Sequence, residues 1–275
     1  MNVELFFHHL RIGDNLLAIL VGLPRLFLII QTVPFMGGSI ITGQIRVAIA
    51  FAVYLFLHPV VLSTLSAPET LTLPVAGYYI LLVLKESFLG FVIGLLAGML
   101  FWAIQSAGFF IDNQRGASMA SSADPLSGQE TSPLGSLFFQ CTVFIFFTGG
   151  GFLAFLGMVY ASYEVWPVHA LLPSGVFAQG LDIPLFFAGR VAWLMATMVL
   201  LSAPIVAACL LTDMSLGLIN RFAAQLNVYI LGMPIKSGLA MFLLFLSFGL
   251  FLIQMTGLFD TLMSDVRFLE HLFHE

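Results

Sequence analysis

Six long apolar stretches, separated by short polar or glycine- and proline-rich breaks, dominate this sequence and limit what it can fold into. They are centred on residues 16–31, 44–62, 78–104, 137–160, 185–211 and 228–256. A helix that crosses a hydrocarbon core about 30 Å thick requires about 20 apolar residues. The sequence therefore predicts an all-α membrane protein of about six long, partly kinked helices arranged as hairpins.

The scarcity of charge supports the same class. Only 8% of the 275 residues are charged and 60% are hydrophobic, whereas a soluble domain carries about 25% charged residues. Most of the surface must therefore face lipid or other protein, and we expect a single membrane-embedded domain over residues 1–275. The net charge of −5 gives no basic face, which excludes nucleic acid as an expected partner. The first residues lack a basic segment followed by a short apolar run, so we expect no removable signal peptide.

Two stretches are longer than a simple membrane span. Residues 76–111 contain no proline, and a straight helix of that length would extend for about 54 Å. Residues 185–222 form a similar run that is interrupted only by Pro204. Such helices must kink, tilt strongly or project from the bilayer against other protein, which favours a packed assembly.

Glycines mark positions of close helix packing. Gly90, Gly94 and Gly98 recur every four residues and form one smooth stripe on a helix, where another backbone can approach closely. The stripe fits packing within the chain or contact with a neighbouring subunit. The run of glycines at 149–151 predicts a bend or a tight crossing in an otherwise apolar helix.

Ionisable groups inside apolar runs are candidates for function, because they are expensive to bury in a membrane. Arg25, Arg190 and Asp213 lie deep enough in their runs to require a partner. Lys85-Glu86 lies near the start of its run and Arg46 follows a glycine break, so we expect their side chains to reach water along the helix surface. A coupled transporter would use such groups as relays or substrate sites; mutual pairing is the structural alternative.

The distribution of basic residues suggests an orientation. With six spans, Arg46, Arg115, Arg221 and Lys236 fall on one side, whereas the opposite loops at 63–77 and 163–182 contain no Lys or Arg. The positive-inside rule places the first set in the cytoplasm.

Residues 112–133 form the most polar segment of the chain and are rich in Gly, Ala and Ser. Because the segment connects two long apolar helices, it is either a re-entrant or pore-facing loop or an ordinary solvated loop. Asp112 and Arg115 are three residues apart and can pair if this turn is helical.

Motifs of enzymes are missing from the sequence. It contains no GxGxxG, GxxxxGK[ST], HExxH or GxSxG, so nucleotide, zinc-protease and nucleophile-elbow chemistry has no support. The histidine pairs near the termini lack further ligands for a metal, and Cys141 and Cys209 fit small buried hydrophobic residues. We expect no enzyme activity, no cofactor and no metal.

Two sets of motifs resemble the SctT/FliR family of type III secretion export-gate proteins. The first reads GFFIDNQRGAS from Gly108, continues with DPLSG from Asp124 and ends with Ser132-Pro133. The second reads Ala203-Pro204, then GLINRF from Gly217, QLNV from Gln225 and GMPIKS from Gly232. The similarity runs in order from Pro24 to about Leu246, and the DNQRG motif resembles the injectisome branch more than the flagellar one. Ala224 stands where the family often has proline, which should loosen that turn slightly.

The resemblance implies a function and two functional segments. A subunit of this family joins SctR and SctS subunits in a helical hetero-oligomeric export gate, a channel for unfolded secreted proteins across the bacterial inner membrane. The SctU switch protein surrounds its base and SctV lies beneath. The resemblance implies a pore plug near 112–133, formed by Asp112, Asn113, Gln114, Arg115, Gly116, Ala117, Ser118, Met119, Ser121, Ser122 and Asp124. It also implies a cytoplasmic hairpin tip near 221–236, with Asn220, Arg221, Gln225, Asn227, Pro234 and Lys236.

A secondary transporter of a small solute is the alternative function. It would use a binding site near the membrane midplane, between repeats in the two halves of the chain. The sequence shows no convincing internal repeat.

Overall fold

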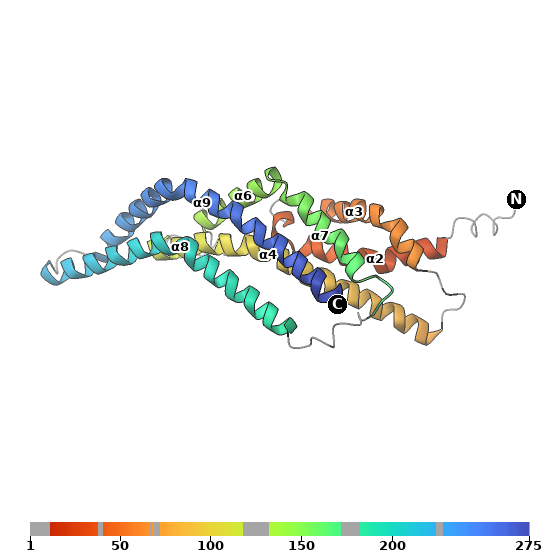
Figure 1. Cartoon of the computed structure of the whole chain (residues 1–275). Helices are drawn as coiled ribbons and strands as arrows, with labels where there is room; N and C mark the ends of the chain where they lie inside the picture. Colours follow the sequence, from red (N-terminus) through yellow and green to blue (C-terminus); the bar gives the residue numbers. More distant parts are fainter. Residues whose placement is uncertain are drawn as a thin grey trace. The chain divides into compact units, whose positions relative to one another are not determined.

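The computed structural model describes residues 12–37, 41–65, 68, 72–117, 132–171, 182–223 and 228–274. Its elements, labelled as in Figure 1, are α2 (Ile12–Thr32), η1 (Pro34–Met36), α3 (Gly43–Thr64), α4 (Leu73–Arg115), α6 (Pro133–Thr148), α7 (Gly151–Val165), α8 (Asp182–Phe222) and α9 (Val228–His274). The described part of the chain contains no strand. Among the described residues, five helices are long and apolar enough to cross a membrane, or six if α6 and α7 count as one span. The predicted all-α class with about six spans is confirmed.

Three helices are much longer than a membrane span. The helices α4, α8 and α9 contain 43, 41 and 47 residues, which corresponds to about 65, 60 and 70 Å at the usual rise per residue. The helix α4 continues through Asp112 to Arg115, so the predicted polar loop begins inside the last helical turn. The helix α9 begins at Val228, which places Pro234 and Lys236 of the predicted hairpin tip within a helix.

The chain divides into two compact units. Unit 1 consists of residues 1–98, 152–184 and 263–275, and unit 2 consists of residues 99–151 and 185–262. We describe each unit by itself.

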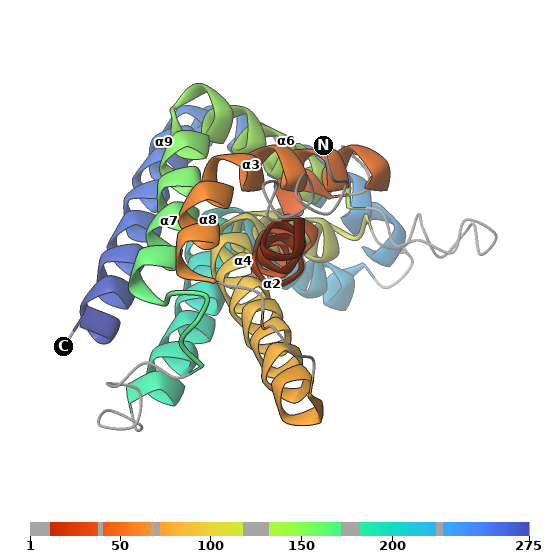
Figure 2. The same ribbon diagram turned by 90° about the vertical axis from the view of Figure 1, so that its right-hand side faces the viewer.

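In unit 1, α2 packs against both α3 and α4. The views in Figures 1 and 2 show α3 beside α2, where the Tyr54 hydroxyl donates a 2.5 Å hydrogen bond to the Ala18 carbonyl. A Cβ added to Gly22 would lie only 2.8 Å from the Tyr54 ring, so this glycine allows the two helices to approach. The core around α2 is formed by fully buried residues such as Val21 and Ile29.

The predicted glycine stripe lies against α2 of the same chain. A Cβ on Gly94 would lie 2.8 Å from Thr32 Cβ, and a Cβ on Gly90 would collide with the backbone carbonyl of Arg25. Gly98 is also buried. For Gly90 and Gly94, the structure therefore supports packing within the chain over contact with a neighbouring subunit.

In unit 2, the end of α4 packs against α6. A Cβ on Gly108 would lie 2.6 Å from the Gly135 nitrogen, so the two backbones are nearly in contact. Aromatic rings fill the space beside this crossing: Phe101 meets Phe146 edge to face at 5.3 Å between ring centroids. The break that the glycine run predicts lies between α6 and α7, where Gly150 has a φ of +78°, a conformation that glycine adopts without steric cost.

Candidate functional site

The structure describes the two ends of the predicted plug segment: residues 112–117 at the end of α4, and residues 132–133 at the start of α6. Gly116 has a φ of +86°, its N–H donates to the Asn113 carbonyl at 3.1 Å, and the Ala117 N–H donates to the Asp112 carbonyl at 2.9 Å. These two bonds and the left-handed glycine form a Schellman motif, which satisfies carbonyls at a helix C-terminus. The Arg-Gly-Ala sequence therefore terminates α4 at a defined residue.

The Asp112 carboxylate joins the two helices that flank the loop. Its Oδ1 accepts a 2.7 Å hydrogen bond from Arg115 Nε. Its Oδ2 accepts bonds from the Ser132 hydroxyl at 2.6 Å and from the Leu134 N–H, the second residue of α6, at 2.9 Å. The carboxylate thus lies where backbone N–H groups at a helix start are unsatisfied and where negative charge is favourable.

Ser132 completes this connection as the N-cap of α6. Its Oγ accepts from the Gly135 N–H at 2.9 Å, and Pro133 occupies the first helical position. A serine followed by proline is the expected start of a helix. We call Asp112, Arg115, Ser132 and the Leu134 N–H the loop clasp, because together they hold both ends of the segment between α4 and α6.

Arg115 also connects the clasp to α9. Its Nη1 donates a 2.9 Å hydrogen bond to Ser237 Oγ. The side chains of Arg115 and Asp112 are only 10% and 4% exposed. A charge-assisted bond that is shielded in this way is stronger than its exposed counterpart.

The predicted plug residues are thus only partly placed. The Asp112–Arg115 pairing is confirmed, and Asn113 is exposed whereas Gln114 is half-buried. Ser118, Met119, Ser121, Ser122 and Asp124 lie outside the described residues. The roles of Ser132 and Ser237 were not among the predictions. The Ser-Pro pair before an apolar run indicates the first, and no sequence pattern indicates the second.

Lys236 of the predicted hairpin tip forms an ion pair with Asp213 on α8. Lys236 Nζ lies 2.9 Å from Asp213 Oδ1, which supplies the partner that the position of Asp213 required. Asn220, Arg221 and Pro234 are exposed, and Gln225 and Asn227 lie outside the described residues. The pair fixes α8 to α9 close to the tip.

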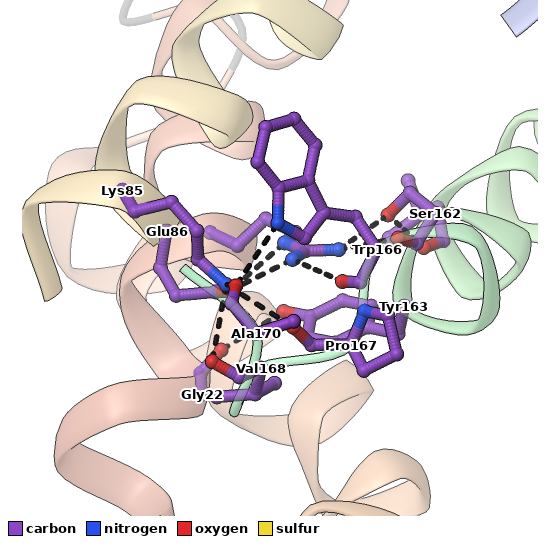
Figure 3. A network of polar contacts seen from close by, with 11 residues as sticks. Gly22, Lys85, Glu86, Ser162, Tyr163, Trp166, Pro167, Val168 and Ala170 are labelled. Atoms are coloured by element: carbon purple, nitrogen blue, oxygen red, sulfur yellow. Dashed lines mark hydrogen bonds and ion pairs between the residues drawn. The ribbon is translucent and has the colours of Figure 1, made fainter. Parts of the chain in front are cut away.

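A second polar cluster lies in the interior of unit 1. Arg25 Nε and Nη2 donate to the two oxygens of Glu86 at 2.7 and 2.8 Å, and Lys85 Nζ lies 2.5 Å from Glu86 Oε1. The side chains of Arg25 and Glu86 are fully buried. Figure 3 shows Lys85 and Glu86 among these polar contacts.

Backbone carbonyls in the last turn of α7 and in the segment that follows it accept from the remaining donors of this cluster. Arg25 donates to the carbonyls of Ser162 and Trp166 at 2.6 and 2.8 Å. Lys85 donates to the carbonyls of Pro167, Val168 and Ala170 at 3.0 to 3.2 Å (Figure 3). Two cations thus share one carboxylate, and the electronegative C-terminal end of α7 offsets the excess positive charge. We call Arg25, Lys85 and Glu86 the buried triad.

The triad corrects one expectation. Neither Glu86 nor Lys85 reaches water along the helix. Glu86 is fully buried and bonded to Arg25, and the Lys85 side chain is only 9% exposed and bonded to Glu86 and to backbone carbonyls. The expectation that Arg25 requires a partner is confirmed. Arg190 is half-buried, and its guanidinium carbon lies 5.2 Å from the centroid of the Phe186 ring. Arg46 reaches water only in part: its Nη1 donates to Gln31 at an exposed position, whereas its Nε is buried without a hydrogen-bond partner in the described part of the chain.

The sequence is similar to proteins of bacterial export systems. The pattern of Bacterial export proteins, family 1, matches residues 16–262. Yop proteins translocation protein T of Yersinia pestis is 38% identical over 230 residues, which cover 83% of this chain and 85% of that protein. Surface presentation of antigens protein SpaR of Salmonella typhimurium is 31% identical over 230 residues, which cover 83% of this chain and 82% of that protein. Flagellar biosynthetic protein FliR of Bacillus subtilis is 27% identical over 250 residues, covering 91% and 93%.

The matched range, residues 16–262, includes the helices α3, α4, α6, α7 and α8 completely, and with them the loop clasp. Identity is higher to the translocation and surface-presentation proteins than to the flagellar protein, as the DNQRG motif indicated. The chain therefore belongs to the bacterial export protein family 1, as an SctT-type protein of the type III export apparatus.

Proposed function

We propose that this protein forms, with SctR- and SctS-type subunits, the channel through which unfolded proteins cross the bacterial inner membrane. The observation that carries the proposal is the loop clasp, which lies at both ends of the small-residue segment in a chain of an export family. Helices of 41 to 47 residues also suit a packed assembly better than a lone bundle. The basic residues place the hairpin tip in the cytoplasm, towards SctU- and SctV-type partners.

The segment between the clasped ends helps to close the pore in this proposal. Gly, Ala and Ser fill a narrow space without bulk, so they can exclude water and ions. They also make few strong contacts, so an arriving polypeptide displaces them at small cost. Because Asp112 ties the end of α4 to the start of α6, the loop can move without separating these helices.

Deletion of residues 118–123 tests the plug. This deletion leaves Ala117 in place, whose N–H closes the Schellman motif. We expect complexes of normal composition and a membrane that leaks ions, measured as conductance in cells without cargo. A matched control replaces the same six residues with glycine and serine; it keeps loop length and small side chains, and we expect it to remain closed. Unchanged conductance in the deletion variant, with normal assembly, would contradict the plug role.

The buried triad is the observation that favours a secondary transporter, because ionisable residues at membrane depth often form proton or substrate sites. Its geometry argues for a structural role instead, since Arg25 and Lys85 donate to fixed carboxylate and carbonyl oxygens. Mild detergent extraction distinguishes the two functions. A gate subunit is recovered in a large complex of fixed stoichiometry, whereas a transporter purifies alone and binds a solute.

A further inference from the structure

The end of α4 is connected to the α8–α9 hairpin as well as to α6. We propose that Arg115 and Ser237 form a coupling joint, through which a displacement of the hairpin tip reaches the point where the loop begins. The purpose of the joint rests on the proposed function, but its existence does not. In this proposal Arg115 and Ser237 are positioning residues for the loop between α4 and α6.

The Arg115 guanidinium is held from two sides. Asp112 fixes its Nε at 2.7 Å, and its Nη1 reaches Ser237 Oγ at 2.9 Å. Since both charged side chains are almost completely shielded, water does not readily replace the serine. A movement of α9 at Ser237 therefore pulls on Arg115 and, through Asp112, on both ends of the loop.

A second contact lies on the same face of α9. A Cβ on Gly116 would lie 3.4 Å from Met233 Cγ, so the turn after α4 meets Met233 in van der Waals contact range. Met233 and Ser237 are four residues apart and therefore share one face of the helix. The end of α4 thus rests on a continuous strip of α9.

The two helices of the hairpin are joined by an ion pair next to this strip. The Asp213–Lys236 pair joins α8 to α9 one residue before Ser237. Ser237 lies nine residues after the start of α9 at Val228, or about 14 Å along the helix. A displacement of α8 at Asp213 therefore acts on α9 directly beside Ser237.

The chain contains a native reporter of this joint. Cys209 on α8 is fully buried, and it lies four residues before Asp213, on the same face of the helix as the Asp213–Lys236 pair. The sequence contains only two cysteines, so Cys141→Ser leaves Cys209 as the single thiol. Separation of α9 from the end of α4 should expose it.

The experiment measures maleimide labelling of Cys209 in the assembled complex in membranes, in a Cys141→Ser background. We expect Ser237→Ala to accelerate labelling about tenfold, the effect of losing one hydrogen bond to a charged group. Ser237→Thr keeps the hydroxyl and should label at the parent rate. The control is Ser247→Ala on the same helix, because the Ser247 hydroxyl donates only to the Leu243 carbonyl of its own helix, at 2.8 Å, among the described contacts.

Equal labelling rates of the parent and Ser237→Ala proteins would overturn the joint. So would an acceleration of the same size in Ser247→Ala, or a Ser237→Thr protein that labels as fast as Ser237→Ala. These outcomes are independent of the conductance test. If Ser237→Ala accelerates labelling but deletion of residues 118–123 causes no ion leak, the joint is supported and the plug role is contradicted.

Discussion

Substitution of Glu86 by glutamine is expected to destabilise the protein by about 3–5 kcal/mol, because it leaves two buried cations without their carboxylate. Arg25 and Lys85 both lie within 2.8 Å of Glu86 oxygens, and the side chain of Arg25 is fully buried. A folded domain is stable by only about 5–15 kcal/mol. The amount of protein in the membrane should therefore fall several-fold, measured by quantitative immunoblotting and by the midpoint of thermal unfolding in detergent.

The chain offers graded controls for this result. Glu164→Gln changes an exposed carboxylate on α7 and should have no measurable effect. Lys85→Met removes one cation and leaves the Arg25–Glu86 ion pair electrically neutral. Its loss of stability should lie between those of Glu86→Gln and Glu164→Gln. If Glu86→Gln and Glu164→Gln proteins accumulate equally, the triad does not stabilise unit 1.

Substitution of Gly90 by alanine is expected to have the second-largest effect, about 1–3 kcal/mol of lost stability from overpacking. The added methyl group would collide with the Arg25 backbone, which cannot move aside like the end of a flexible side chain. The same collision would displace Arg25 from Glu86 and disturb the triad. The readout is the unfolding midpoint of the purified protein and its yield.

Gly77→Ala is the matched control on the same helix. A Cβ at Gly77 meets nothing within 4 Å, so only helix propensity changes, by up to about 1 kcal/mol in favour of alanine. Gly94→Ala should be intermediate, because a Cβ there would lie 2.8 Å from Thr32 Cβ and 3.0 Å from the Ile29 carbonyl oxygen, which is tight but less so than at Gly90. If the Gly90→Ala and Gly77→Ala proteins have the same unfolding midpoint and yield, α2 and α4 do not approach as closely as described.

Much of the architecture could be predicted from the sequence. Apolar stretches of sufficient length specify membrane helices, because each helix satisfies its own backbone hydrogen bonds. The glycine run predicted the break between α6 and α7, and the three-residue spacing predicted the Asp112–Arg115 pair. These features are local, so a few neighbouring residues determine them.

The pairings between helices were decided only by the tertiary structure. Arg25 meets Glu86 across 61 residues and the Ser162 carbonyl across 137, and Arg115 meets Ser237 across 122. A helix that is apolar on all sides gives no periodic pattern to show which face packs inward. The sequence by itself therefore determined only the local features and the family: the membrane spans, the breaks between them and the membership in the export family. The burial of Glu86, the partner of the glycine stripe and the link from α4 to α9 depended on which helix faces came together.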